Sequence, residues 1–321
     1  MSSDNNLPII EFKEVSKNYR DVTALRGVTF TINKGDIFGY IGPNGAGKTT
    51  TLKILVGLIR DYSGEVKISG QILHEMSDWG RLIGYMPQDV GFQEWRTVDH
   101  ALMTFGLLSG MKKAELLERI PEVLELVGLS EARKRKIKHL SGGMEQKLKL
   151  AQALLHDPSI LILDEPMSGL DPTSRWQMKN IIRQLANREI TIIFSSHILS
   201  DVEDIATTFG ILNQGLVVKI GKPKELQKEL VGGEGVELNG ENLLEKQDLF
   251  KSLSFVASIS PVNNSPDRIH LYFSKDTNIN QALKELIDFL SKNDLVVRNL
   301  NYLKPSLEQV YLKYVMEGAG V

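Results

Sequence analysis

Short runs of apolar residues alternate with longer segments of helical periodicity over the first two thirds of the chain. The apolar runs predict buried strands at Ile9–Phe12, Ile37–Ile41, Gly64–Ile68, Ile83–Met86, Ile160–Leu163 and Thr191–Ser195. Segments with apolar residues three and four apart predict helices at Lys48–Val56, Lys112–Val127, Ser141–Leu155 and Arg175–Ala186. This alternation favours an α/β fold, in which helices cover the faces of a buried parallel or mixed sheet.

The pattern changes after about residue 222, and the glycine-rich stretch Val231–Gly235 predicts a linker or turn. Beyond it we expect strands at Phe255–Ile259, Arg268–Phe273 and Val296–Tyr302, and helices at Ile279–Leu290 and Ser306–Val315. The chain thus predicts a first domain over residues 1–224, with a helical subdomain over about 89–155, and a small α+β domain over residues 225–321. No catalytic pattern recurs in the second domain, which favours an accessory or regulatory role.

Composition and charge exclude several classes of function. The chain has no cysteine, so disulfides, thiolate catalysis and cysteine metal sites are absent. The formal net charge of −2 gives no electrostatic basis for binding nucleic acid or an anionic membrane. The apolar runs fall far short of the ~20 residues that cross a bilayer, and the N-terminus lacks a signal-peptide pattern. If the protein works at a membrane, we expect another chain to supply the spanning part.

A glycine-rich loop between a predicted strand and a predicted helix is the leading candidate for chemistry. It consists of Gly42, Pro43, Asn44, Gly45, Ala46, Gly47, Lys48 and Thr49. This spacing is typical of loops whose backbone N–H groups surround a polyphosphate at a helix N-terminus. Lys48 would reach the β- and γ-phosphates, and the Thr49 hydroxyl would coordinate Mg²⁺. The alternative is a glycine-rich turn that binds nothing.

Two acids, Asp164 and Glu165, directly follow the predicted strand Ile160–Leu163. In an open α/β sheet, ligands bind at the carboxyl ends of the strands. Asp164 therefore suits the binding of Mg²⁺, directly or through water, and Glu165 suits a base that polarises an attacking water. Solvated acids at an ordinary strand end are the alternative interpretation.

Four further residues are candidates that also have simple structural interpretations. Ser141 precedes a predicted helix, where it suits either an N-cap or, with the glycines after it, a second anion-binding helix start. His197 follows the predicted strand Thr191–Ser195 and suits a sensor of the γ-phosphate, although a lone histidine there is often structural. Gln88 follows another predicted strand, and Tyr19 suits either stacking on adenine or a place in the core.

In identity and order, these elements resemble the nucleotide-binding subunits of ABC transporters over roughly residues 9–222. The motifs that carry the resemblance are GPNGAGKT (42–49), YMPQD (85–89), LSGGMEQ (140–146), ILILDEP (160–166), SGLD (168–171) and SSH (195–197). They are similar to that family's phosphate loop, glutamine loop, signature, second phosphate motif, D-loop and histidine switch. The signature separates this family from other phosphate-loop ATPases, so the combination is specific. Lys147 and Met167 depart from the residues common in the family without touching the chemistry.

The resemblance implies a phosphate-loop ATPase fold of the ABC type and hydrolysis of ATP in sites that two subunits share, most simply two copies of this chain. Within one subunit it assigns Tyr19 to adenine, residues 42–49 and Thr50 to phosphates, Thr49, Gln88 and Asp164 to Mg²⁺, and Lys48, Glu165 and His197 to catalysis. Across the dimer it assigns Ser141, Gly142, Gly143 and Gln146 to the partner's ATP, and Asp171 to the link between the sites.

The resemblance also implies a separate membrane permease, and hence a cytoplasmic protein lying on the inner face of the cell membrane. The chain end Pro305–Lys313 looks like the closing helix of a group that energises exporters of drugs, antibiotics, sodium or polysaccharide. A soluble ABC ATPase that acts on ribosomes, DNA or cofactor assembly is the alternative, and a non-catalytic ATP-binding regulatory module is a third interpretation.

The stretch Gln88–Gly106 is the surface that we expect to contact a partner. It holds Phe92, Trp95 and Phe105, which we expect to be exposed, and the family places its groove for the membrane subunit there. We expect the basic run Arg133–Lys136 to be a solvated loop rather than a binding surface.

Overall fold

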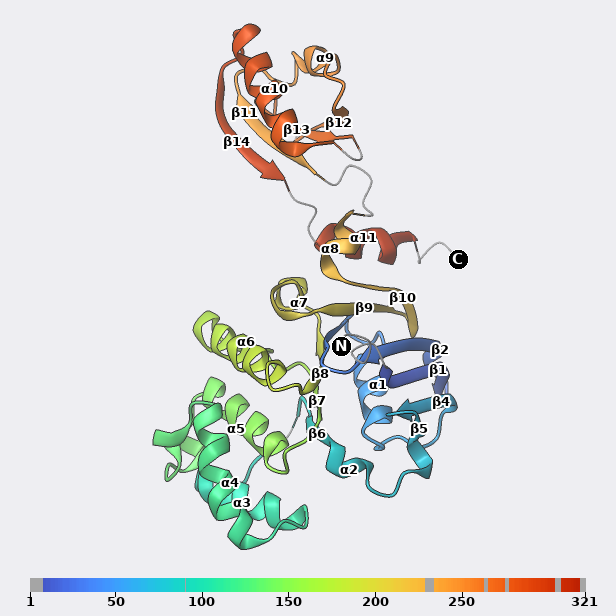
Figure 1. Cartoon of the computed structure of the whole chain (residues 1–321), viewed down its shortest axis with the longest axis vertical. Coiled ribbons are helices and arrows are strands. Elements are labelled where there is room, and N and C mark those ends of the chain that lie inside the picture. The colour runs from blue at the N-terminus through green and yellow to red at the C-terminus, as the bar shows by residue number, and fades with distance from the viewer. Residues whose placement is uncertain are drawn as a thin grey trace, which may run out of the picture. The chain divides into compact units, whose positions relative to one another are not determined.

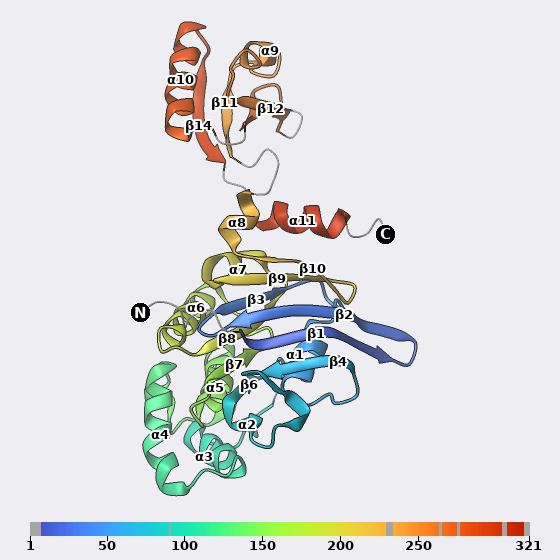
Figure 2. The ribbon, with the colours of Figure 1, turned by 45° about the vertical axis from the view of Figure 1, so that its right-hand side comes forward.

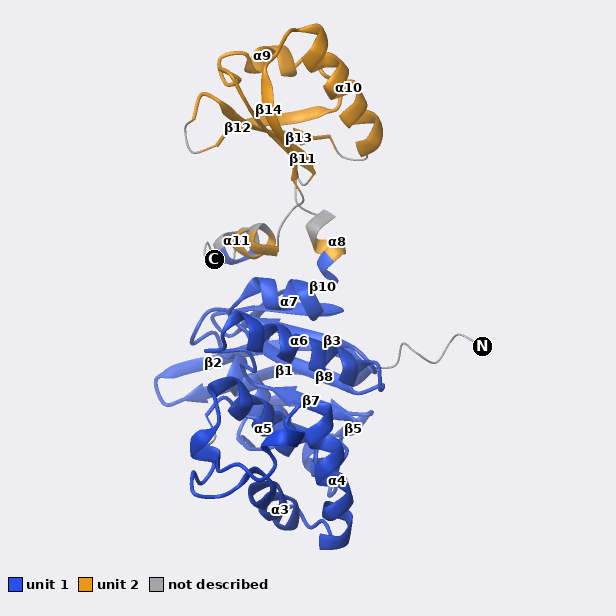
Figure 3. Ribbon diagram, turned by 90° about the vertical axis from the view of Figure 1, so that its left-hand side faces the viewer, with its two compact units in different colours: residues 1–223, 314–321 blue, residues 224–313 orange. Residues whose placement is uncertain are grey.

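A computed structural model of the chain (Figure 1) describes residues 8–89, 91–228, 234–262, 265–274, 277–303 and 307–317. The chain forms two compact units (Figure 3): residues 1–223 with 314–321 make one, and residues 224–313 make the other. Residues 231–233 of the predicted linker lie outside the described residues, whereas Gly235 begins a strand. None of the described helices is both long and apolar enough to cross a membrane.

The central sheet of the first unit has the strand order β10-β9-β3-β8-β7-β6. The strand bounds are β3 Ile37–Ile41, β6 Ile83–Met86, β7 Ile160–Leu163, β8 Thr191–Ser196, β9 Thr208–Asn213 and β10 Leu216–Gly221. Strands β9, β3, β8, β7 and β6 run parallel to one another, and the edge strand β10 pairs antiparallel with β9. Strands β3, β7 and β8 are buried at every position, as expected for central strands covered on both faces. Their carboxyl ends therefore meet at one edge of the sheet.

A second, antiparallel sheet of the same unit has the order β2-β1-β4-β5. Its strands are β1 Pro8–Tyr19, β2 Val22–Asn33, β4 Ser63–Ile68 and β5 Gln71–Ile72. The ring of Phe30 stacks on Phe12 with centroids 4.6 Å apart, and on Phe38 of β3 with centroids 5.4 Å apart. The second sheet therefore packs on the central sheet through an aromatic core, with helix α1 (Lys48–Leu55) beside them (Figure 2).

The longer helices of the first unit fall into two groups. Helix α1 leads from β3 of the central sheet to β4 of the second sheet, α6 (Pro172–Ala186) and α7 (Leu199–Ile205) connect strands of the central sheet, and the short α2 (Trp79–Leu82) leads into β6. Helices α3 (Val98–Leu108), α4 (Lys113–Leu126) and α5 (Gly142–Leu154) pack against one another (Figure 1). A Cβ on Gly106 would lie 2.2 Å from Cδ2 of Leu116, so the glycine allows the close approach of α3 and α4.

The second unit holds an antiparallel sheet of order β12-β13-β11-β14 and the helices between its strands. Its elements are β11 Gly235–Gly240, α9 Gln247–Phe250, β12 Val256–Pro261, β13 Arg268–Phe273, α10 Ile279–Lys292 and β14 Val297–Leu303. This βαββαβ order is the split βαβ arrangement of ferredoxin-like folds. Its core packs Leu286 of α10 against Val236, Leu271 and Phe250. Helix α8 (Pro223–Lys228) precedes the sheet, and α11 (Leu307–Glu317) follows it.

Every predicted strand and helix is confirmed over the described residues, with ends that move by a few residues, and β1 extends as far as Tyr19. Ser306, the predicted start of the last helix, lies outside the described residues. Strands β2, β5, β9, β10 and β11 and helices α2, α3, α7, α8 and α9 were not among the predictions. The C-terminal half of β2 alternates between buried and exposed residues, and that signal is visible in the sequence. The other missed elements are short or carry few polar residues, so their periodicity is weak.

Candidate functional site

The loop of residues 42–49 joins β3 to α1 along a path that only glycine permits at two positions. Gly47 has a φ of 111°, and a Cβ there would lie 2.6 Å from the carbonyl oxygen of Ala24 in β2. A Cβ on Gly42 would lie 2.3 Å from the carbonyl oxygen of Leu212 in β9. Larger residues at either position would push the loop away from the strands that support it.

Lys48, the first residue of α1, folds back over this loop. Its ammonium group donates hydrogen bonds to the carbonyl oxygens of Gly42, at 2.8 Å, and of Pro43, at 3.2 Å. The same Nζ lies 3.5 Å from Oε1 of Glu165, and both side chains are buried. Each buried charge therefore has an opposite charge beside it, which limits the cost of desolvation.

Glu165 follows β7 and contacts His197, which follows the neighbouring strand β8. Nδ1 of His197 lies 2.8 Å from Oε2 of Glu165, and the histidine side chain is 43% exposed. Glu165 has a φ of 50°, a left-handed conformation that residues other than glycine rarely adopt. The carboxylate is thus fixed at one oxygen by Lys48 and at the other by His197, at the edge of the sheet.

Asp164 is buried beside Glu165 and is held by two hydroxyl groups. Its Oδ1 accepts hydrogen bonds from Ser195 at 2.7 Å and from Thr49 at 3.2 Å. Ser195 Oγ in turn accepts a hydrogen bond of 2.8 Å from the backbone N–H of Glu165. Ser195 therefore orients both acids, a role that the sequence analysis did not assign to it. A fully buried strand that ends in polar residues was the available signal.

The pair of Thr49 and Asp164 fits a site for Mg²⁺. Oδ2 of Asp164 is buried and has no hydrogen-bond partner among the described residues. A buried carboxylate oxygen without a partner is unfavourable unless a cation or water reaches it. The described residues contain no group of three or more His, Asp or Glu that could hold a metal by themselves. Mg²⁺ commonly takes one or two protein ligands together with water and phosphate, and Thr49 and Asp164 offer two oxygen ligands.

Tyr85 of β6 adds an aromatic wall near these acids. Burial raises the pKa of Tyr85, and the negative charge of Asp164 raises it further. Its hydroxyl oxygen is buried and accepts or donates no hydrogen bond within the described part of the chain. The tyrosine therefore stays neutral beside the carboxylate.

Ser141 and Asp171 act as helix caps. The Ser141 hydroxyl accepts a hydrogen bond from the N–H of Met144, which confirms the predicted N-cap of α5. Asp171 accepts hydrogen bonds from the N–H groups of Thr173, at 2.9 Å, and Ser174, at 3.0 Å, at the start of α6. Hydrogen bonds from the Ser174 side chain and backbone, with a smaller contribution from Thr173, lower the pKa of Asp171.

The structure brings five of the candidate residues into direct contact: Lys48, Thr49, Asp164, Glu165 and His197. No hydrogen bond or ion pair of the described chain joins a second group of candidates to those five. That group consists of Ser141, Gly142, Gly143, Gln146 and Asp171. Gly143 lies close to α6, because a Cβ at this position would be only 2.4 Å from the Ser174 hydroxyl. The start of α5 therefore packs against the start of α6.

Two further candidates are exposed at strand ends. Gln88 lies just past β6, and its backbone carbonyl accepts a hydrogen bond of 3.4 Å from Lys149. Tyr19 ends β1 with 44% of its surface exposed, so the interpretation as a core residue is wrong. Both side chains are free to contact a ligand.

The structure agrees only in part with the predicted partner surface. Phe92 is buried rather than exposed, with its ring edge-on to Phe105 at 5.6 Å, because α3 covers it. Trp95 is 62% exposed, as predicted, and the guanidinium group of Arg96 lies 4.8 Å from its ring centroid. The basic run is not wholly solvated either, since Arg133 forms an ion pair of 2.7 Å with Asp99.

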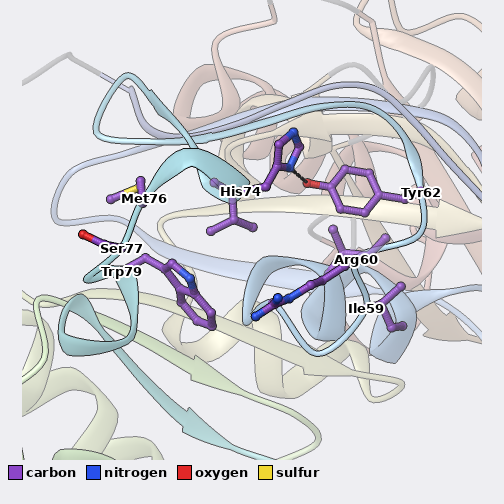
Figure 4. A pocket seen from close by; sticks show the side chains of 10 residues that line it. Ile59, Arg60, Tyr62, His74, Met76, Ser77 and Trp79 are labelled. Carbon is purple, nitrogen blue, oxygen red and sulfur yellow. Dashed lines mark hydrogen bonds between the residues drawn. The ribbon is translucent and has the colours of Figure 1, made fainter.

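Two surface hollows lie outside the group of contacting residues. One of about 230 Å³ lies between the end of α1 and the segment leading to α2, where Tyr62 and His74 share a hydrogen bond and Arg60 and Trp79 face one another (Figure 4). Another of about 330 Å³ is lined by Tyr85, Pro87, Phe105, Ser109, Gln152 and His156. Neither is lined by a residue of the phosphate loop.

Comparison with known proteins identifies relatives along nearly the whole chain. A sequence profile described as ABC transporter matches residues 25–168. The uncharacterized ABC transporter ATP-binding protein YxlF of Bacillus subtilis (strain 168) is 36% identical over 310 residues, covering 96% of this chain and 99% of that protein. The linearmycin resistance ATP-binding protein LnrL of the same organism is 30% identical over 305 residues, covering 95% and 97%. The Nod factor export ATP-binding protein I of Paraburkholderia xenovorans (strain LB400) is 33% identical over 240 residues, covering 74% and 79%.

The fold has close counterparts among solved structures. The dimeric structure of MJ0796, a bacterial ABC transporter cassette, matches with a TM-score of 0.60 and 25% sequence identity, covering 66% of this chain and 98% of that chain. The predicted fold class, an α/β phosphate-loop ATPase with additional C-terminal strands, is thereby confirmed.

Proposed function

Because this chain belongs to the ABC transporter family of ATP-binding proteins, we propose that residues 42–49 bind the phosphates of ATP and that Glu165 activates the attacking water. One observation carries the assignment of the base: the buried Glu165 carboxylate lies between Lys48, at 3.5 Å, and His197, at 2.8 Å. A carboxylate held in this way at the carboxyl edge of the sheet is positioned to accept a proton from water.

Phosphoryl transfer needs chiefly positioning and neutralisation of charge. Lys48 leaves the carbonyl groups of its own loop to pair with the β- and γ-phosphates. Glu165 takes the proton of the water whose oxygen attacks the γ-phosphorus, and the bond from that phosphorus to the oxygen of ADP breaks. Thr49 and Asp164 would hold Mg²⁺, whose positive charge offsets the charge of the phosphates. His197 keeps the carboxylate facing the reaction and contacts the γ-phosphate.

Dimerisation would complete the site. Ser141, Gly142, Gly143 and Gln146 lie apart from Lys48 and Glu165 in one subunit, and the helix start at Ser141 suits the γ-phosphate of a partner's ATP. Asp171 sits at the start of α6, which packs against the start of α5, and so would link one site to the other. The solved cassette MJ0796 is a dimer, which supports this arrangement.

We further propose that the subunit powers a separate membrane permease and that the system exports its substrate. The relatives named for linearmycin resistance and Nod factor export support export. Exposed apolar residues of the helical group, namely Trp95, Leu107, Leu108 and Leu117, and the hollow at Pro87 and Phe105 suit a helix of a permease. The protein would then lie on the cytoplasmic face of the membrane, with residues 224–313 as an accessory unit.

The test of the catalytic assignment is Glu165→Gln, which keeps the size of the side chain and removes its charge. We expect kcat for ATP hydrolysis to fall about 100-fold or more, while ATP still binds. Glu125→Gln, on the exposed face of α4, is the matched control and keeps the wild-type rate. A Glu165→Gln variant that hydrolyses ATP as fast as the wild type would rule out Glu165 as the base.

The transport assignment is tested by expressing the chain with and without a permease encoded beside its gene. We expect the chain to enter the membrane fraction only when the permease is present. If it instead purifies with a soluble complex and never reaches the membrane, the alternative of a non-transport ABC ATPase holds.

A further inference from the structure

Lys17 of β1 is a buried lysine whose position the catalytic site does not explain. Only 8% of its side chain is exposed. Its ammonium group donates hydrogen bonds to the backbone carbonyl oxygen and the carboxylate of Asp61, the latter at 3.0 Å. The Asp61 side chain is fully exposed, so this carboxylate offsets little of the cost of burying the ammonium group.

The third neighbour of the Lys17 ammonium group is the ring of Tyr19. Nζ lies 4.9 Å from the ring centroid, within the range of a cation–π interaction. The two residues stand two positions apart on β1, where the register with β2 shifts between Lys17 and Asn18, and this contact places the ammonium group over the ring. Lys17 therefore occupies one face of the tyrosine ring. Tyr19 is nevertheless 44% exposed, which leaves part of the residue open to a ligand.

The pairing of β1 with β2 places this ring close to the phosphate loop. Lys17 pairs in register with Leu25, and Tyr19 pairs with Val22. Leu25 and its neighbour Ala24 contact the position where a Cβ of Gly47 would stand. Asp61 lies in the segment between the end of α1 and β4, so the Lys17–Asp61 contact joins β1 to the chain that follows the phosphate-loop helix.

We propose that Lys17 is a positioning residue for the base of the bound nucleotide: it holds the Tyr19 ring from one face so that a purine base stacks on the other. A cation on one face draws π density toward itself, so the opposite face repels the π density of a stacked base less. Lys17 thereby acts on the base and leaves the phosphates to Lys48. This inference rests on the proposed binding of ATP at residues 42–49.

The test compares ATP with inorganic tripolyphosphate, which offers the phosphates without the base. Binding of each is measured by calorimetry, with Mg²⁺, to the full chain and to Lys17→Met, which keeps a long side chain and removes the charge. We expect Lys17→Met to weaken ATP binding about fivefold and to leave tripolyphosphate binding unchanged. Lys17→Arg, which restores a cation over the ring, should recover most of the loss.

Two controls separate positioning from damage to the fold. Lys67→Met, on β4 of the same sheet, removes a lysine that forms an ion pair with Glu65, and it should bind both ligands as the wild type does. In a Tyr19→Leu background, Lys17→Met should cause no further loss of ATP affinity, because the ring through which it acts is gone. If Lys17→Met does not fold, Lys17→Gln removes the charge while keeping a hydrogen-bond donor, with the same expectations.

Three outcomes would overturn the inference: equal ATP affinity for wild type and Lys17→Met, an equal loss for ATP and tripolyphosphate, or a further loss in the Tyr19→Leu background. Failure of the wild type to bind ATP at all would instead overturn the proposed function. The two failures are therefore distinguished by the wild-type measurement alone.

Discussion

Nδ1 of His197 lies within hydrogen-bonding distance of Oε2 of Glu165, at 2.8 Å, although 32 positions separate the two residues in the chain. The contact exists because β7 and β8 are parallel neighbours whose carboxyl ends lie side by side. The partially exposed imidazole thus restrains a buried carboxylate from the solvent side.

Replacing His197 by alanine should free the Glu165 carboxylate to rotate. We expect ATP hydrolysis to fall by up to about 100-fold, because a misplaced base loses its alignment with the attacking water. Steady-state assays of phosphate release at saturating ATP measure this effect. His139→Ala, which removes an exposed histidine, should keep the wild-type rate, and a fully active His197→Ala variant would show that the contact plays no part.

Asp164→Asn should separate the binding of nucleotide from the binding of Mg²⁺. The amide oxygen still accepts hydrogen bonds from Ser195 and Thr49, but the negative charge at the buried Oδ2 position is lost. We expect ATP affinity in the presence of Mg²⁺ to fall at least about tenfold, and ATP affinity in EDTA to stay the same or rise. Asp157→Asn on the surface is the control. Equal affinities for Asp164→Asn and wild type with Mg²⁺ would contradict the assigned role.

Comparing Gly47→Ala with Gly45→Ala separates the effect of a steric clash from the effect of an unfavourable backbone conformation. Both glycines have positive φ, 111° and 81°, but only a Cβ at Gly47 meets other atoms, the nearest 2.6 Å away. We expect Gly45→Ala to destabilise the unit by about 1 kcal/mol through conformation alone. Gly47→Ala should cost more and should also abolish binding of ATP. Thermal unfolding and nucleotide binding are measured on both, and equal behaviour would show that the Gly47 contact is not limiting.

The stability contributed by Asp171 should depend on pH. Its pKa is lowered in the folded chain by hydrogen bonds to the charged form, so its contribution is present above the ordinary carboxyl pKa and is lost as the pH falls through the folded value. Asp171→Ala should therefore lower the melting temperature at pH 7, and the difference from wild type should shrink as the pH falls below about 4. Asp171→Asn keeps a side chain that can cap the helix, so its melting temperature should lie between those of the wild type and Asp171→Ala. If the difference in melting temperature between the wild type and Asp171→Ala did not change with pH, the charged form of Asp171 would not be what stabilises the helix start.

The local parts of the site were predictable because single segments encode them. The loop of residues 42–49 lies between one strand and one helix, and Asp164 and Glu165 end a strand whose four residues are all apolar. The cap at Ser141 also depends only on residues next to it. None of these predictions requires knowing which strands are neighbours in the sheet.

The contacts between segments could not be read in the same way. That Ser195 binds Asp164 depends on the neighbouring positions of β7 and β8, which no local pattern specifies. Phe92 looked exposed because its segment is polar, but α3 brings Phe105 against it. The contact of Lys17 with Asp61 spans 44 positions and depends on how β1 meets the segment after α1.

The left-handed backbone at Glu165 has a consequence for how this protein can change. Glycine would adopt a φ of 50° without strain, whereas glutamate at that position opposes the preference of its own Cβ. Backbone strain and turnover therefore favour different residues at position 165, since glycine would relieve the strain but would remove the carboxylate beside the buried Lys48. A change to glycine that relieved this backbone strain would therefore give up the carboxylate proposed to activate water.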